Sequence, residues 1–134
     1  MKIVSSLFFL GATMLFSGSA LAEWQEIGKT DAFTLYADTA TIDKQGDKAQ
    51  IMSLLDFKKP GQNPKTKEAA NSLIGLNEFD CAAVKYRPIE FKVFSGNMGK
   101  GKVVEEQKTP DSQFETIENG SWPAGVYNVA CRSK

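Results

Sequence analysis

The sequence contains no histidine, and this absence removes several kinds of active site at once. A Ser-His-Asp or Cys-His centre needs an imidazole base, so both are excluded. The chain has two cysteines, Cys81 and Cys131, which lie far apart and form no C-x-x-C pair. Two isolated thiols without a histidine cannot complete a four-ligand zinc site, so a closed zinc site is excluded as well.

The chain also lacks an excess of basic charge. Lys and Arg together number 16, and Asp and Glu together number 16, which gives a formal net charge of zero. A nucleic-acid-binding domain usually carries a clear basic excess on one face. We therefore expect no nucleic-acid partner.

Long apolar runs are confined to the N-terminus. An apolar stretch follows Lys2, and Ala20 and Ala22 occupy the small-residue positions of a signal peptidase site. This pattern predicts a signal peptide over residues 1–22 and a mature protein that begins at Glu23. The apolar stretch is short for a membrane span, which needs about 20 residues. With no cysteine directly after the cleavage site, we expect no lipid anchor and no membrane span, but export through the inner membrane to the periplasm, the cell surface or the medium.

The predicted mature chain, residues 23–134, has the size of a single domain. Two cysteines in an oxidising compartment normally pair, so we expect a disulfide between Cys81 and Cys131. In the chain-entropy model, closing a loop of this length is worth about 4 kcal/mol. That is a large share of the stability of a small domain.

Several segments of the mature chain alternate polar and apolar residues, as strands with one buried face do. These segments are residues 33–38, 48–58 and 88–94. Residues 72–84 are predicted as a strand because they are mostly apolar, and residues 102–107 because they contain two successive β-branched residues. Gly46 and Asp47 predict a hairpin turn between the first two segments, and a stretch rich in Pro and Gly predicts a loop over residues 58–67. Gly75 is a candidate β-bulge.

The C-terminal segment has a different period. Trp122, Val126 and Val129 are spaced as one face of a helix, and Ser121 precedes them as a candidate N-cap. The helix is predicted to end near Cys131. The predicted fold class is therefore α+β: an antiparallel β-sheet meander with a C-terminal helix packed on it and one disulfide that clamps the helix to the sheet.

Residues 96–102, GNMGKGK, match the glycine and lysine spacing of a phosphate-binding P-loop. However, Val103 stands where a P-loop needs a Ser or Thr hydroxyl. The residues that follow, KVVEEQ, have strand character, whereas a P-loop leads into a helix. We interpret the segment as a glycine-rich hairpin, and we expect neither a nucleotide nor any other cofactor.

Acidic residues are numerous enough to supply the carboxylate pair of a glycosidase. They lie mostly at turns and outward strand positions, where solvated acids are expected. The candidates are Asp38, Asp43, Asp56, Glu78 and Asp80. We predict no catalytic and no metal-binding residue, and an enzyme with a carboxylate pair is the third of three functional alternatives.

Several pieces of the sequence, taken in order, resemble the surface-adhesin protein E family of bacterial secreted proteins. The pieces are Trp24, YADTATID (36–43), Ser72, FDC (79–81), YR (86–87), FSGNMGKGKVV (94–104), Phe114, Ser121 and Cys131. The resemblance implies a non-enzymatic surface or periplasmic protein, in which the disulfide holds a C-terminal helix on an antiparallel sheet. The better-known members bind host extracellular-matrix and serum proteins. The chain departs from the family by carrying Phe114 in place of the usual Trp and by lacking a lipidation cysteine.

The leading functional hypothesis is a non-enzymatic, adhesin-like binding domain for another protein or an anionic polymer. Two basic clusters support it, because such clusters attract acidic surfaces and speed encounter. One lies in the predicted loop and consists of Lys58, Lys59, Lys65 and Lys67, and the other is the candidate binding site. Its members are Lys85, Arg87, Lys92, Lys100 and Lys102. The alternative is a periplasmic inhibitor or chaperone-like partner of a cell-envelope enzyme, a role that suits a small, disulfide-clamped β domain.

Overall fold

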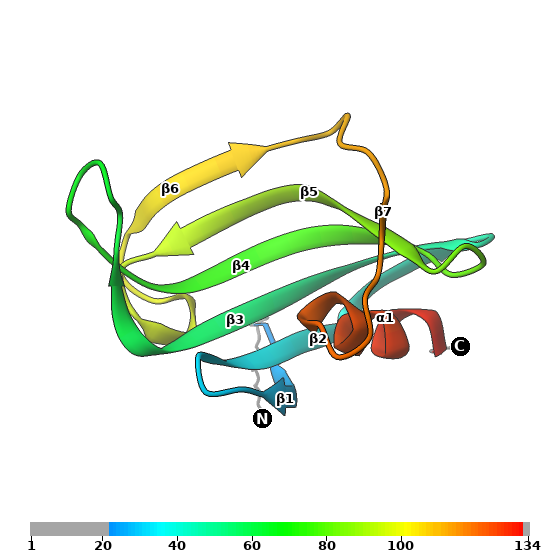
Figure 1. Ribbon diagram of the computed structural model, residues 1–134, viewed down its shortest axis with the longest axis horizontal. Coiled ribbons are helices and arrows are strands. Elements are labelled where there is room, and N and C mark those ends of the chain that lie inside the picture. The colour runs from blue at the N-terminus through cyan, green and yellow to red at the C-terminus, as the bar shows by residue number, and fades with distance from the viewer. Residues whose placement is uncertain (1–21, 133–134) are drawn as a thin grey trace, which may run out of the picture.

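The protein is described by a computed structural model that covers residues 22–132, so the predicted signal peptide lies outside the described residues except for Ala22. The elements, in chain order, are β1 (Gln25–Lys29), β2 (Phe33–Gln45), β3 (Lys48–Gln62), β4 (Ala69–Asp80), β5 (Lys85–Phe94), the 3-10 helix η1 (Asn97–Gly99), β6 (Val103–Lys108), β7 (Glu115–Thr116) and α1 (Trp122–Arg132). Strands β1 to β6 pair in sequence order, and every pairing is antiparallel (Figure 1). Short β7 pairs with the start of β5. The predicted meander with one C-terminal helix is confirmed.

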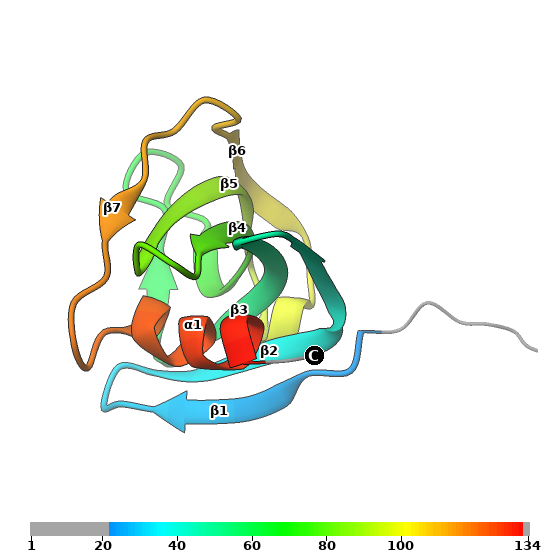
Figure 2. The ribbon, with the colours of Figure 1, turned by 90° about the vertical axis from the view of Figure 1, so that its right-hand side faces the viewer.

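The sheet curves around α1, which covers one of its faces (Figure 2). We call this side the helix face and the opposite side the back face. Successive strand residues point to opposite faces, and those on the helix face pack against Val126 and Ala130 of α1. The buried strand residues of this core are Leu35, Ala37, Ala49, Ile51, Leu55 and Phe79. Phe79 and Ile51 are fully buried, and burying a side chain of this size contributes about 1.5–3 kcal/mol.

The predicted disulfide joins the end of β4 to the last turn of α1. Cys81 and Cys131 are bonded, with their Cα atoms 5.6 Å apart. The hydroxyl of Tyr127 donates a hydrogen bond of 2.7 Å to the carbonyl oxygen of Cys81. The strand predicted to run to residue 84 ends at Asp80, and the chain then turns toward β5. The helix is therefore attached to the sheet by a covalent bond and by a hydrogen bond to the same residue.

The predicted loop over residues 58–67 is shorter than expected, because β3 continues to Gln62. The pairing of β3 with β4 is interrupted between Asp56 and Gly61 and then resumes. Pro60 lies inside this interruption, where no backbone N–H of β3 is needed for a hydrogen bond to β4. A proline therefore does not end the strand at this point.

The predicted bulge at Gly75 is wrong. Gly75 pairs regularly with Ser53 on β3 and with Phe91 on β5. A Cβ atom at this position would lie 3.5 Å from the Cβ atom of Phe91, which is an ordinary contact distance. The register shift between β4 and β5 lies one step further on, between Leu76 and Asn77.

Ser121 stands directly before α1, as predicted, but its side chain acts differently from an N-cap. Its hydroxyl donates a 2.6 Å hydrogen bond to the carbonyl oxygen of Glu118, which closes the turn before the helix. The first-turn N–H of Ala124 instead bonds to the Ser121 carbonyl at 3.1 Å. The helix start is thus fixed mainly by the turn that precedes it.

Candidate functional site

The glycine-rich segment between β5 and β6 folds onto the back face of the sheet. Asp56 on β3 accepts hydrogen bonds from the side chain of Asn97 (3.0 Å) and from the backbone N–H of Met98 (2.7 Å). On β4, the hydroxyl of Ser72 donates a hydrogen bond to the carbonyl oxygen of Gly96 (2.6 Å) and accepts one from the backbone N–H of Gly99 (2.9 Å). These side chains hold the backbone of the segment against the sheet. The strand predicted after it is confirmed as β6, whereas a phosphate-binding loop would lead into a helix.

An apolar hollow of about 230 Å³ lies next to this segment on the back face. Alternate residues of three neighbouring strands contribute to it, and two charged side chains lie among them. The contributing residues include Met52, Ile74, Leu76, Glu90, Lys92 and Phe94. The hollow is too small and open to enclose a drug-sized ligand, which occupies roughly 300 Å³ or more.

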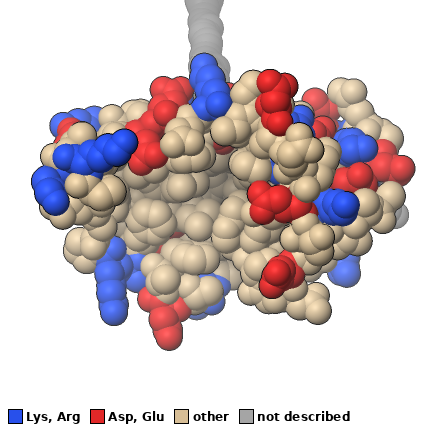
Figure 3. All heavy atoms as spheres, turned by 45° about the horizontal axis from the view of Figure 1, so that its top comes forward, with Lys and Arg blue, Asp and Glu red and all other residues tan. Residues whose placement is uncertain are grey.

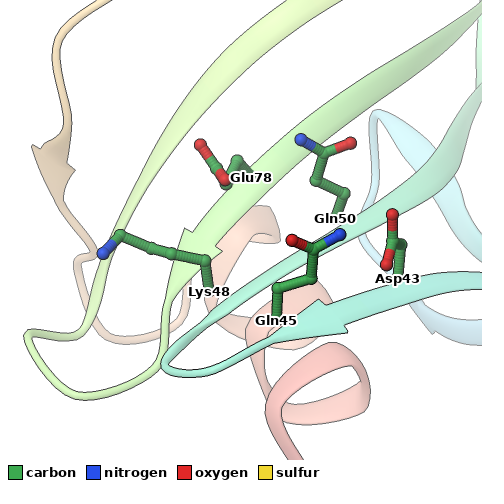
Figure 4. Close-up of a pocket in the computed structure, with 5 residues that line it drawn as sticks. All are labelled: Asp43, Gln45, Lys48, Gln50 and Glu78. Carbon is green, nitrogen blue, oxygen red and sulfur yellow. The ribbon is translucent and has the colours of Figure 1, made fainter.

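The other end of the back face is polar. A hollow of about 220 Å³ lies between the hairpin of β2 and β3 and the end of β4, and five residues line it (Figure 4). They are Asp43, Gln45, Lys48, Gln50 and Glu78. The back face therefore changes from polar to apolar along the length of the strands.

Phe114, in the segment before β7, lies beside two basic side chains of this polar end. The Lys48 ammonium and the Arg87 guanidinium lie 5.8 and 5.5 Å from the centre of its ring. Arg87 also donates a 2.8 Å hydrogen bond to Glu78 and a 2.7 Å hydrogen bond to the carbonyl oxygen of Pro110. Lys48 in turn lies 3.6 Å from a carboxylate oxygen of Asp80, so each of the two cations has an acidic partner. The sequence around Phe114 carries no signal of its contact with cations.

The β5 strand carries three of the five basic residues proposed for binding. Lys85 pairs with Asp80 and Arg87 with Glu78, whereas Lys92 pairs with Ile74. If β5 alternated regularly, Lys92 would point to the face opposite that of Lys85 and Arg87. The register shift in β5 skips one residue, Ile89, and so brings all three to the back face.

The remaining two basic residues lie beyond the far end of β5. Lys100 is exposed in the turn after η1, and Lys102 forms a 2.5 Å ion pair with Glu68. The backbone carbonyl of Lys102 bonds to the N–H of Ser95, so this residue does return beside β5. Lys85 and Lys92 are seven positions apart on an extended strand, which is roughly 20 Å. Lys85, Arg87 and Lys92 therefore form a row along β5, and Lys100 and Lys102 lie in the segment that follows this strand.

Two of these basic residues have acidic neighbours. On the face that Figure 3 shows, basic and acidic side chains lie around a central hollow of uncharged residues. Lys92 pairs across the strands with Glu106 of β6. The hydrogen bond from Lys102 holds the pKa of the Glu68 carboxyl below its ordinary value. Lys92 and Lys102 thus each lie beside an acidic residue.

The candidate acids of a carboxylate pair hold structural positions. Asp38 is buried, and its carboxylate accepts hydrogen bonds from backbone N–H groups. Asp56 holds η1, and Glu78 pairs with Arg87. The hydrogen bond from the backbone N–H of Ala83 is the main reason why the pKa of the Asp80 carboxyl lies below its ordinary value. Among residues 22–132, no group of three or more metal-ligating side chains is positioned to hold a metal ion.

The family model of surface-adhesin protein E matches residues 24–132, which is most of the chain. The chain belongs to this family. The recognition made from the ordered sequence pieces is thereby confirmed. No curated protein sequence gives a significant match.

Solved structures of Haemophilus influenzae protein E share the fold of this family member. One structure aligns with a TM-score of 0.62 at 13% identity, covering 84% of this chain and 86% of the other. A second crystal form gives a TM-score of 0.59 at 14% identity, covering 72% and 79%. The protein from a non-typeable strain gives 0.58 at 14% identity, covering 85% and 76%. At these identities the likeness establishes the fold.

In the described part of this family member, no helix has the length and apolar character of a membrane span. Membership in a surface-adhesin family fits a protein that acts at the cell surface or after secretion.

Proposed function

We propose that this family member is a non-enzymatic, exported, adhesin-like protein that binds another protein through the back face of its sheet. Host extracellular-matrix and serum proteins are the candidate partners, as the family resemblance implies. The match to the surface-adhesin family over nearly the whole predicted mature chain supports a binding role. Residues 1–22 are proposed to direct export and to be removed.

One observation carries the choice of surface: the register shift in β5. It places Lys85, Arg87 and Lys92 on one face, and the turn after η1 adds Lys100 at the end of the same row. Arg87 and Lys102 are already ion-paired, so the exposed lysines Lys85, Lys92 and Lys100 offer the charge that a partner would meet. The apolar hollow beside Lys92 offers contact area next to this charge.

The test is association with immobilised matrix and serum proteins as a function of salt. We expect Lys92→Gln combined with Lys100→Gln to slow association by roughly threefold or more at low salt, since exposed charges act mainly on the rate of encounter. Glutamine is chosen because Lys92 faces Glu106, and a carboxylate there would add cross-strand repulsion. The effect should fade at high salt, where screening shortens the range of the interaction.

A matched control removes the same charge elsewhere. Lys29→Gln combined with Arg132→Gln changes β1 and the end of α1, away from the row. Equal effects of the two pairs would show that net charge alone matters and would contradict the proposed surface. Binding confined to a protein captured from periplasmic extract would instead support the alternative of an envelope inhibitor or chaperone-like partner.

A further inference from the structure

Asp38 is a buried acid whose carboxylate faces the first described residues of the chain. Its exposed fraction is 5%. One carboxylate oxygen accepts a 3.0 Å hydrogen bond from the N–H of Ala40, and the other accepts one of 3.3 Å from the N–H of Glu23. Its carbonyl oxygen accepts a hydrogen bond of 2.6 Å from the hydroxyl of Thr41. Asp38 is thus held in place, with one oxygen directed at Glu23.

Glu23 is the residue that follows the predicted signal peptidase motif ending at Ala22. Hydrolysis of the Ala22–Glu23 bond by an export-associated peptidase would consume one water, release the Ala22 carboxylate and leave an amino group on Glu23. That amino group is protonated at neutral pH, since its ordinary pKa is about 8. We infer that this cleavage converts the backbone N–H facing Asp38 into an α-ammonium that forms an ion pair with the buried carboxylate.

The geometry favours this ion pair over the amide contact that precedes it. A distance of 3.3 Å is long for an N–H···O hydrogen bond, whereas ammonium–carboxylate bonds are usually about 2.7–2.9 Å. Cleavage frees the nitrogen to approach and gives it three donors and a full charge. Gln25 pairs with Ala37, so β1 holds Glu23 beside Asp38 at little further cost in chain entropy.

The charged side chains on the segment that carries the new amino group are Glu23, Glu26 and Lys29, and Lys29 forms an ion pair with Glu26. On β2, Tyr36 pairs with Glu26, and burial raises its pKa, so it is uncharged at neutral pH. From β3, the residue paired with Asp38 is the uncharged Met52. The inference rests on the export that forms part of the proposed function, but it needs no binding partner.

The first measurement is the intact mass of the protein recovered after export, which should correspond to a chain beginning at Glu23. A different N-terminus would overturn the inference, whatever the protein binds. Loss of matrix binding in the preceding experiment would leave this result unaffected, so the two proposals fail separately.

The second measurement is a cycle of four proteins in denaturant unfolding at pH 7. The mature chain and its N-acetylated form are compared, each with Asp38 and with Asp38→Asn, which keeps an acceptor for Ala40. Acetylation should raise the unfolding constant about tenfold in the native background, the usual size of a charged hydrogen bond. It should have no effect in the Asp38→Asn background. An equal effect in both backgrounds would overturn the ion pair.

A pH series on the unsubstituted chain decides the question even if Asp38→Asn does not fold. An amino group paired with a carboxylate has a higher pKa in the folded state than in the unfolded state. The advantage of the free amino group over the acetylated one should therefore be full below about pH 8 and should disappear as the pH rises through the folded-state value. A difference that stays constant up to pH 11 would contradict the inference.

Discussion

At the scale of single residues, Gly99 shows why the glycine-rich segment takes its form. Its φ angle is +73°, and the preceding Met98 has a φ of 58°, so two successive residues adopt left-handed backbone. A Cβ atom on Gly99 would lie 2.7 Å from the Cδ1 atom of Ile74. Gly99, which lies between the two glycines of the P-loop spacing, thus serves a turn that packs against the sheet.

We expect Gly99→Ala to lower the free energy of unfolding by about 1–3 kcal/mol, because it adds left-handed strain and crowds the back face. Gly28→Ala is the matched control, since a Cβ atom there meets nothing within 4 Å. Denaturant unfolding of both variants measures the difference. Equal stability of the two variants would show that η1 does not pack on the sheet as described.

Asp80 controls the turn between β4 and β5. Its Oδ1 atom accepts hydrogen bonds from the N–H groups of Ala83 (2.9 Å) and Ala82 (3.1 Å), and Lys48 lies 3.6 Å from its Oδ2 atom. The bond from Ala83 is the largest cause that holds the pKa of Asp80 below its ordinary value, with Lys48 a smaller one.

A lowered folded-state pKa gives Asp80 a definite pH dependence. Its contribution should be present above the unfolded-state value of about 3.9 and should be lost as the pH falls through the folded-state value. The stability difference between the native chain and Asp80→Ala should therefore be constant near neutrality and shrink below about pH 4. Urea unfolding from pH 2 to pH 7 provides the measurement. A difference that grows in acid would refute this account.

At the scale of elements, the long strands and the helix could be predicted because their pattern of polar and apolar residues reflects which side chains are buried. The alternation in β2 and β3 and the period of α1 follow from one buried face each. Strand β1 could not be predicted because its residues are half-buried or exposed and show no buried face. Strand β7 could not be predicted because two residues are too few to show an alternation of polar and apolar side chains. The pairing that makes them strands comes from their neighbours.

The candidate site also depends on strand pairing, which the local sequence pattern does not reveal. Sequence reasoning named the basic residues but could not tell which face of β5 each one occupies, because that depends on a register shift set by pairing with β4. Pro88, which has no N–H to donate to a ladder, was the one local signal of an irregularity. The contact of Phe114 with Lys48 and Arg87 joins three distant segments and has no local signal.

The disulfide is the element-level feature with the largest expected effect. Replacing Cys81 and Cys131 together by serine should lower the free energy of unfolding by about 2–5 kcal/mol, because the unfolded chain is no longer constrained. Peptide mass mapping of the oxidised native protein should show the cross-linked pair. Reduction of the native chain should reproduce the loss seen in the double variant, and a stable reduced protein would contradict this expectation.

At the scale of the whole molecule, the order of assembly follows from the position of α1. The helix is the last described element of the chain, yet it covers a core built from β2, β3 and β4. Until the helix docks, the core around Ile51 and Phe79 lacks the contribution of Val126 and Ala130. Contacts this distant in sequence form slowly, since a long loop must close before they are made. A chain from which α1 has not yet emerged therefore lacks this cover and cannot complete its core.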